Sequence, residues 1–243
     1  MSSYSAEEVS ANYEKEFGAE DGAVVHRLTV SVSQLFHEWR LFLYLFCGRK
    51  ERVDALNAAS GSTAKVLGNL LWDNAVLKVR ALTDYEKIGS NRNMSLQNLC
   101  RIAKKFDIVD LDGPFEEMRA KCEKSRKYAD KYLAHRDFHH SVGRKSSPIT
   151  RDETTASVEA IGDFVRLFHS RVRDTDYFLA PVMGADNEEK FLTLLHLGSI
   201  KLDEMRAEEI EDVRAGRYDT RSKYEWPEWV WANELRGTPF SIR

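Results

Sequence analysis

The chain has 243 residues, 42% of them hydrophobic and 31% charged, a balance that predicts a globular protein with a sizeable core. Five prolines and 13 glycines are too few for a turn-rich β protein, and the net charge of −3 excludes a protein that binds nucleic acid over its whole surface. Three widely spaced cysteines predict neither a disulfide framework nor a CxxC metal site, so we expect reduced thiols in a cytoplasmic protein.

The first predicted elements are a short helix and a long amphipathic one. The N-terminal residues are polar and acidic, unlike a signal peptide, and Ser5 with Glu8 forms a capping-box pattern for the short helix. The apolar residues that follow recur at steps of three and four: Val25, Leu28, Val32, Leu35, Phe36, Trp39, Phe42, Leu43 and Phe46. This spacing predicts one helical face, with Gly48 as its C-cap. The apolar run 41–47 is far shorter than the roughly 18 residues of a membrane span, so we expect no membrane segment.

A second long helix is predicted over about 63–86, after a short helical turn in RVDALNAA. Its broad apolar face consists of Val66, Leu67, Leu70, Leu71, Val76, Val79 and Leu82. Arg80 and Asp84 are spaced i, i+4, which predicts an ion pair on this helix. Ser95 is the predicted N-cap of the next helix, in SLQNLCRIAKKF.

The remaining elements are also predicted to be helical. Pro114 fits the first position of a helix that runs to about His140, and a polar loop follows at 141–153. An i, i+3, i+4 pattern predicts a further helix around 158–172, and two more are expected near 187–196 and 199–215. We therefore predict an all-α bundle of four or more long helices with additional short helices. It forms one domain over 1–243, in which 216–243 is an aromatic-rich tail.

The predicted helix that ends near His140 is strongly basic. The window from Arg119 to Lys145 holds nine lysines and arginines but only three acidic residues, a local charge of +6 in an acidic chain. Such a window favours binding to the phosphate backbone of a nucleic acid. The candidate RNA-binding side chains are Lys124, Lys127 and Lys131. A solvated helix face with charge compensation from other elements is the alternative.

His135, in the same window, is the candidate proton-transfer residue. An imidazole with a pKa near neutral can take a proton from a ribose 2′-hydroxyl or give one to a leaving oxygen. His135 and His139 also have the i, i+4 spacing of a zinc pair, but HExxH is absent and no third ligand shares their face. We therefore expect no metal and no cofactor.

Two segments together resemble a known family. LLWDNAVLKVRALTDYEKIGSNRNMSLQNL is similar to the second-helix signature of the HEPN superfamily, in its abortive-infection AbiU-type branch. KYLAHRD resembles the end of that family's signature helix, and YLFCGRKERVDALNAA also fits the branch. The resemblance covers about 40–205. It implies an all-α bundle that dimerises, and metal-independent cleavage of RNA through a cyclic phosphate. It also implies a role in phage defence or as a toxin paired with an antitoxin protein.

The family's motif is an arginine, usually followed by a polar residue, and a histidine after four to six intervening residues. The histidine carries over to His135 and the polar residue to Asp130, but Ala129 stands where the arginine belongs. Arg126 and Arg136 are the nearest substitutes for it. The tyrosine that some members carry two places after the histidine is replaced here by Asp137.

Two hypotheses follow from this departure. The chain is either an endoribonuclease whose candidate catalytic residues are His135, Asp130, Arg136 and Arg126, or a degenerate bundle that binds RNA or a protein partner without cleavage. Loss of one phosphate-binding cation weakens transition-state stabilisation by about 2–4 kcal/mol, judged from oxyanion-hole donors. Ala129→Arg would restore the motif, and a gain in cleavage would favour a degenerate site.

Overall fold

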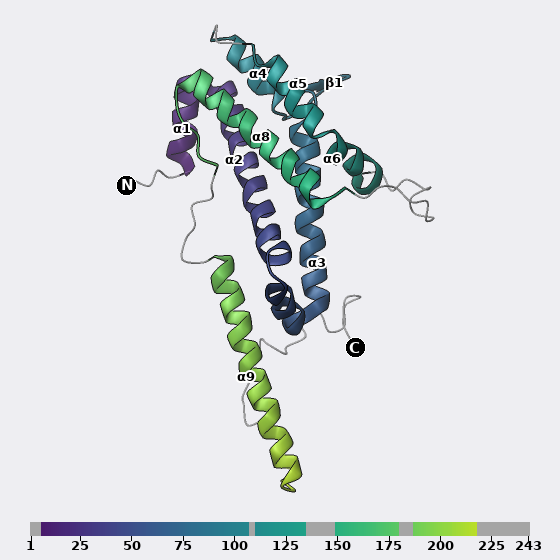
Figure 1. The fold of residues 1–243 in the computed structure, drawn as a ribbon. Helices are drawn as coiled ribbons and strands as arrows, with labels where there is room; N and C mark the ends of the chain where they lie inside the picture. Colours follow the sequence, from purple (N-terminus) through teal and green to yellow (C-terminus); the bar gives the residue numbers. More distant parts are fainter. Residues whose placement is uncertain (1–5, 107–109, 135–148, 180–186, 218–243) are drawn as a thin grey trace, which may run out of the picture. The chain divides into compact units, whose positions relative to one another are not determined.

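A computed structural model describes residues 6–106, 110–134, 149–179 and 187–217, and nearly all of its regular structure is helical (Figure 1). The predicted all-α class is confirmed. By contacts the chain divides into two units, 1–193 and 194–243, and the boundary falls inside one helix. Ser5, the predicted capping residue of the first helix, lies outside the described residues, as does most of the tail 216–243.

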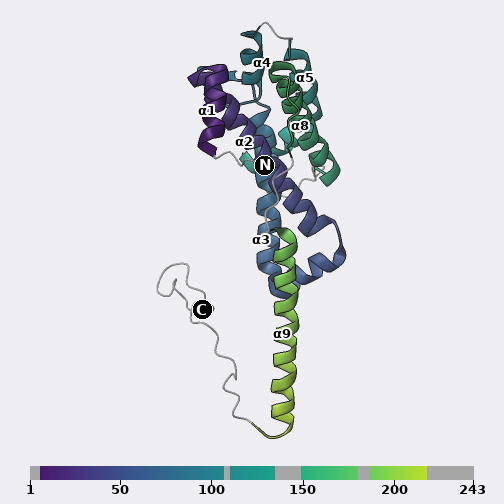
Figure 2. The ribbon, with the colours of Figure 1, turned by 90° about the vertical axis from the view of Figure 1, so that its left-hand side faces the viewer.

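The first two helices form a hairpin. α1 spans Ala6–Phe17 and α2 spans Ala19–Phe42, and Gly18 between them has a φ of +83°, a conformation that favours glycine. Figure 2 shows α1 folded back from the start of α2. Gly22 lies so close to α1 that a Cβ atom there would be 2.5 Å from the carbonyl oxygen of Tyr13. The absence of a side chain at Gly22 therefore allows the two backbones to touch.

The predicted helix over 25–46 is confirmed, but it begins earlier and its last turn is wider. α2 continues into the π-helical segment η1, Leu43–Cys47, and Gly48 is the C-cap as predicted. Its φ of −85° is an ordinary right-handed value, so this cap makes no use of the freedom of glycine. The π turn lets the aromatic side chains of Phe42 and Phe46 pack at 5.7 Å between ring centroids.

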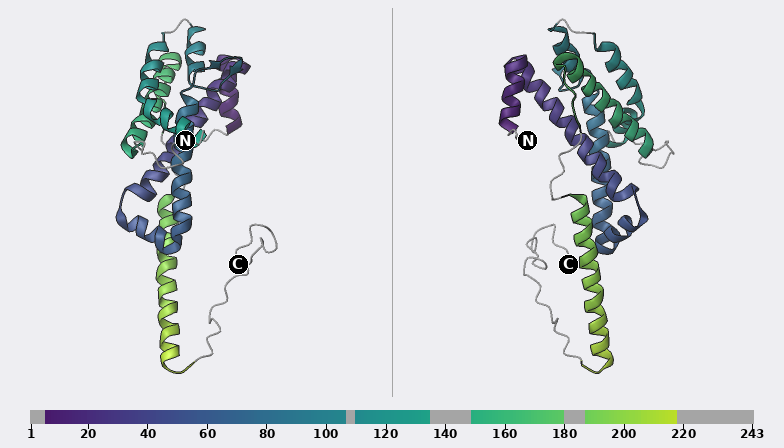
Figure 3. Two further views of the ribbon diagram at one scale, coloured as in Figure 1. Left: turned by 90° about the vertical axis from the view of Figure 1, so that its right-hand side faces the viewer. Right: turned by 60° about the vertical axis from the view of Figure 1, so that its left-hand side comes forward.

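The predicted short helix and second long helix are both parts of α3, Lys50–Leu82, which is kinked at Ser60 (Figure 3). The Ser60 hydroxyl caps the second segment by accepting a hydrogen bond from the backbone N–H of Thr63. The helix ends four residues earlier than predicted, where the Thr83 hydroxyl donates to the carbonyl oxygen of Val79. A short antiparallel hairpin of β1, Lys87–Ile88, and β2, Asn91–Arg92, follows.

Two details predicted for these helices are wrong. Val66 and Leu70 were expected in the core, but their side chains are 57% and 62% exposed, because the buried side chains of α3 are concentrated between Ala75 and Leu82. Ser95 does not cap α4, Gln97–Lys104, because its hydroxyl is buried without a hydrogen-bond partner and Leu96 is the N-cap residue.

The predicted continuous helix from Pro114 is interrupted. α5 spans Asp112–Lys121, and Pro114 is its third residue rather than its first. The helix breaks at Cys122, resumes as α6, Glu123–Tyr128, and continues as the π-helical segment η2, Ala129–Ala134. The two predicted C-terminal helices are one helix, α9, Glu188–Arg214, which continues through Gly198.

α8, Arg151–Arg173, is the central packing helix of the first unit. It opens on a complete capping box made by Thr150 and Glu153 and ends at Asp174, whose φ is +48°. It packs against α2 and α5, and in Figure 1 it runs beside both. The fully buried side chains of this core come from several helices: Leu28, Leu35, Leu99, Ile102, Phe115, Ile161 and Phe168.

Candidate functional site

The basic segment α6–η2 lies against the C-terminal half of α3. The two main segments of the family resemblance, on α3 and on α6–η2, are therefore neighbours in space, although some 50 residues separate Arg80 from Asp130 in the chain. Because η2 is π-helical, its side chains have a different rotation per residue from that assumed for a regular helix. Side chains between Ala129 and Ala134 therefore do not share faces as they would in a regular α-helix.

Arg126 is a buried structural cation. Its guanidinium donates hydrogen bonds to the carbonyl oxygen of Arg80 at 3.1 Å, the Thr83 hydroxyl at 2.8 Å and Asp84 Oδ1 at 2.9 Å. The side chains of Arg126 and Asp84 are only 11% and 8% exposed. The pair joins α6 to the end of α3, so the donors of Arg126 are directed into the protein rather than toward a ligand.

Arg80 is the arginine at the outer edge of this cluster. The predicted ion pair with Asp84 is confirmed, with Nη1 at 2.9 Å from Oδ2. The structure adds a second contact that was not predicted, because Arg80 Nε also donates to Asp130 Oδ1 at 2.9 Å. The side chains of Arg80 and Asp130 are 36% and 45% exposed, so this end of the cluster is open to solvent.

Ala129, which occupies the position of the family's arginine, is fully buried. An arginine introduced there would have to place a charged group in the interior or displace η2 from α3. Ala129→Arg is therefore a poor test of the site, since a loss of folding would mask any gain of chemistry.

The three candidate RNA-binding lysines differ in their surroundings. Lys124 pairs with Glu153 at the start of α8, and Lys127 pairs with Glu123 one turn earlier at 3.0 Å. Lys131 is exposed and has no acidic partner within the described part of the chain. The charge of +6 in the sequence window is thus partly neutralised by other elements.

His135 and Arg136 lie outside the described residues, as does His139. Among the residues that the structure does describe, no cluster of three histidine, cysteine or acidic side chains could hold a metal ion. Cys100 and Cys122 are buried, and burial raises the pKa of both thiols to about 12, so neither is a ready nucleophile. No described helix combines the length and hydrophobicity that crossing a membrane requires.

His169 is a buried histidine that the sequence did not single out. Burial, together with the nearby charge of Arg173, lowers the pKa of its imidazole to about 4. Its ring stacks on Tyr177 with centroids 4.3 Å apart, and Nε2 lies 3.4 Å from the Thr29 hydroxyl. At neutral pH it is an uncharged core residue. It lies near the C-terminal end of α8, whereas the basic segment contacts the start of that helix through Glu153.

The comparisons with known proteins agree with the resemblance seen in the sequence. A family model of the HEPN type, described as AbiU2, matches residues 21–215. The matched region includes α3 and the segment α6–η2, and thus every described residue of the cluster around Asp84. No curated protein and no solved structure matches the chain.

Proposed function

Because the chain belongs to the AbiU2 family of HEPN proteins, whose role is in abortive infection, we propose that it is a metal-independent endoribonuclease. In the proposed reaction a ribose 2′-oxygen attacks the adjacent phosphorus, the bond to the 5′-oxygen breaks, and a 2′,3′-cyclic phosphate remains. His135 takes the proton from the 2′-hydroxyl, and the leaving 5′-oxygen receives a proton from the resulting imidazolium or from water. Arg80 holds the phosphate, and Asp130 orients Arg80.

The contact between Arg80 and Asp130 carries this proposal. Asp130 follows the alanine that replaces the motif arginine, and the Arg80 guanidinium lies 2.9 Å from its carboxylate. Arg80 Nε and Nη1 bond Asp130 and Asp84, whereas Nη2 has no partner within the described ranges. A half-exposed guanidinium with free N–H groups is suited to a phosphate oxygen. Arg80 thus supplies, from α3, the cation that position 129 lacks.

A second function is favoured by the charge balance of the same cluster. Asp84 and Asp130 together neutralise Arg80 and Arg126, so these four side chains carry no net charge. A phosphate must compete with Asp130 for Arg80. Under this alternative the chain binds RNA or a protein partner, such as an antitoxin, without cleaving RNA.

The test is cleavage of a mixed RNA pool by the purified chain in EDTA, with the ends of the products analysed for cyclic phosphate. Wild type is compared with His135→Ala, Arg80→Ala and Arg80→Lys, and Arg166→Ala, an exposed arginine of α8, is the matched control. We expect loss of cleavage in His135→Ala and a reduction of about 10²–10³ in Arg80→Ala, by analogy with removal of one oxyanion donor.

Each outcome separates the two functions. Cleavage that survives both His135→Ala and Arg80→Ala would rule out the proposed site. RNA binding by wild type without any cleavage would establish the second function instead.

We also propose a homodimer, as the family resemblance implies, and sedimentation of the purified chain at several concentrations tests it.

A further inference from the structure

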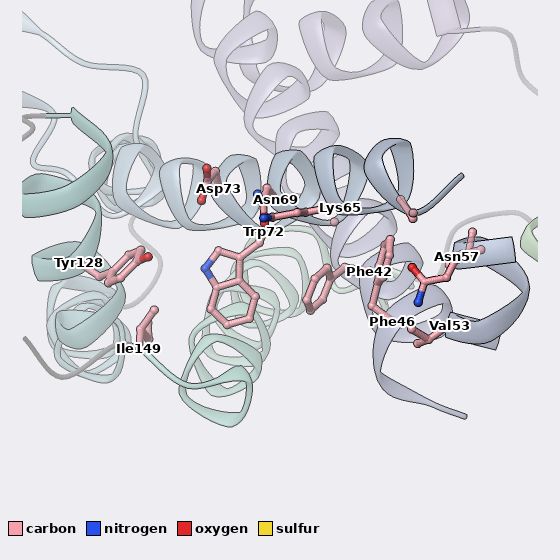
Figure 4. A pocket seen from close by; sticks show the side chains of 14 residues that line it. Phe42, Phe46, Val53, Asn57, Lys65, Asn69, Trp72, Asp73, Tyr128 and Ile149 are labelled. Atoms are coloured by element: carbon pink, nitrogen blue, oxygen red, sulfur yellow. The ribbon is translucent and has the colours of Figure 1, made fainter. Parts of the chain in front are cut away.

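A pocket of about 530 Å³ lies along α3, beside the segment α6–η2 (Figure 4). Its volume falls within the roughly 300–1,000 Å³ of sites that bind small ligands. Trp72 points from α3 into the pocket, with Tyr128 and Ile149 on one side and Phe42 and Phe46 on the other. The site just proposed and this pocket therefore share both α3 and the basic segment.

The aromatic side chains of the pocket support one another. Phe42 packs edge-to-face on Trp72, with centroids 5.3 Å apart, and the lining residue Tyr128 is stacked at 4.6 Å by Tyr132, which is not among the lining residues. The indole nitrogen of Trp72 is on the side of the ring that faces Tyr128 in Figure 4. Rings held in this way form walls on which a planar ligand can stack with little loss of side-chain entropy.

Three polar side chains of the pocket lack partners among the residues that the structure describes. Lys65, Asn69 and Asp73 make neither a hydrogen bond nor an ion pair with any residue that the structure describes. Asp73 is half-buried, and burial raises the pKa of its carboxyl group. Its charge is near enough to Tyr128 to raise the pKa of that phenol, after the larger effect of burial. A half-buried carboxylate without donors favours a ligand that brings N–H groups.

We propose that this pocket binds a nucleobase of single-stranded RNA, with guanine preferred. Unstacked RNA bases are recognised by stacking on aromatic rings and by hydrogen bonds to their Watson–Crick edges. Guanine presents its N1–H and its 2-amino group side by side, and one carboxylate accepts both. Lys65 at the rim suits the attached phosphate. The inference rests on the proposed action on RNA and names the base that the pocket prefers.

The test is calorimetric titration of the full-length chain with the four nucleoside 5′-monophosphates and with guanosine. Guanosine monophosphate is expected to bind most tightly. Asp73→Asn should weaken its binding about tenfold or more, the discrimination expected of a bidentate contact, and should remove the preference over adenosine monophosphate. Lys65→Ala should weaken the binding of guanosine monophosphate but leave the affinity for guanosine unchanged.

Substitutions of exposed residues outside the pocket are the matched controls for nonspecific effects on binding. Asp176→Asn changes an exposed carboxylate and Phe178→Leu an 86% exposed ring, and both should bind as wild type. Tyr128→Leu tests the stacking wall, and its thermal unfolding is measured alongside. Should Tyr128→Leu fail to fold, Asp73→Asn decides, because Asp73 has no described partner to lose.

The outcomes distinguish this inference from the proposed function. Cleavage of RNA without binding of any mononucleotide, or binding that Asp73→Asn and Tyr128→Leu leave unchanged, would overturn the base pocket and leave the nuclease intact. Binding of guanosine monophosphate that depends on Asp73, in a chain that cleaves no RNA, would uphold the pocket and reject the nuclease.

Discussion

At the scale of single residues, Arg80 and Arg126 contact the same carboxylate but have different surroundings. Asp84 receives Arg126 in the interior and Arg80 at the surface. Removing one partner of a buried ion pair leaves the other charge and its hydrogen-bonding neighbours unsatisfied, whereas an exposed pair contributes little. Arg126 should therefore contribute mainly to stability, and Arg80 mainly to the proposed chemistry.

We expect Arg126→Ala to lower the free energy of unfolding by about 3 kcal/mol, because Asp84 and the Thr83 hydroxyl each lose a buried donor. Arg80→Ala should lower it by less than about 1 kcal/mol. Urea denaturation followed by circular dichroism measures both. Equal losses in the two variants would contradict the assignment of Arg126 to the fold and Arg80 to the site.

The residue scale also shows the limit of reading the site from sequence. The pair Arg80–Asp84 was predictable because i, i+4 spacing on one helix brings two side chains together. The contact of Arg80 with Asp130 was not predictable, because it depends on how α6–η2 packs against α3. The burial of Ala129 and Arg126 depends on the same packing. Other alanines and arginines of the chain are exposed, so residue type alone could not identify these two as buried.

At the scale of elements, the existence and type of the long helices were predictable, but their ends and interruptions were not. The apolar periodicity predicted both α2 and α8, because their buried faces repeat at the helical period. Their starts were missed, since α2 begins six residues before Val25 and α8 begins at Arg151, inside the predicted loop 141–153. The break at Cys122 and the π turns η1 and η2 cannot be recognised from the apolar periodicity of the sequence. A π turn adds a residue without changing composition, and tertiary packing decides where it occurs.

Gly22 offers a prediction at this scale, since it allows α1 to lie against α2. Gly22→Ala should destabilise the chain by about 1–3 kcal/mol, because the added methyl group would meet the backbone of Tyr13 and Glu14 at about 2.5 Å. Gly113→Ala in α5 is the matched control, with nothing within 4 Å of the new Cβ atom. Thermal unfolding should show a lower midpoint only in the first variant, and a shared shift would contradict the close approach.

At the scale of the whole molecule, the net charge of −3 requires that any contact with RNA be local. Of the three candidate lysines, Lys131 has no acidic partner in the described ranges, whereas Glu153 and Glu123 neutralise the other two. Among these three lysines, only Lys131 is therefore available for RNA phosphates. The dependence of RNA affinity on salt reports the number of bound phosphates directly.

We expect a shallow salt dependence, to which each phosphate contact contributes about −0.7 in the slope of log affinity against log salt for a single strand. Lys131→Ala should reduce the slope by about that amount, and Lys124→Ala should leave it nearly unchanged. Titrations of a labelled RNA at several salt concentrations measure both. A steep slope that falls equally in the two variants would point to a broad basic surface instead.

The sharing of Asp84 between two arginines also bears on how such a protein can change over generations. While Arg126 keeps the carboxylate paired inside, we expect a mutation at Arg80 to cost little stability. Selection can then test new side chains at the surface position one at a time, without a compensating change in the interior. Lineages that start from this arrangement are free to lose, regain or redirect their chemistry while the bundle persists.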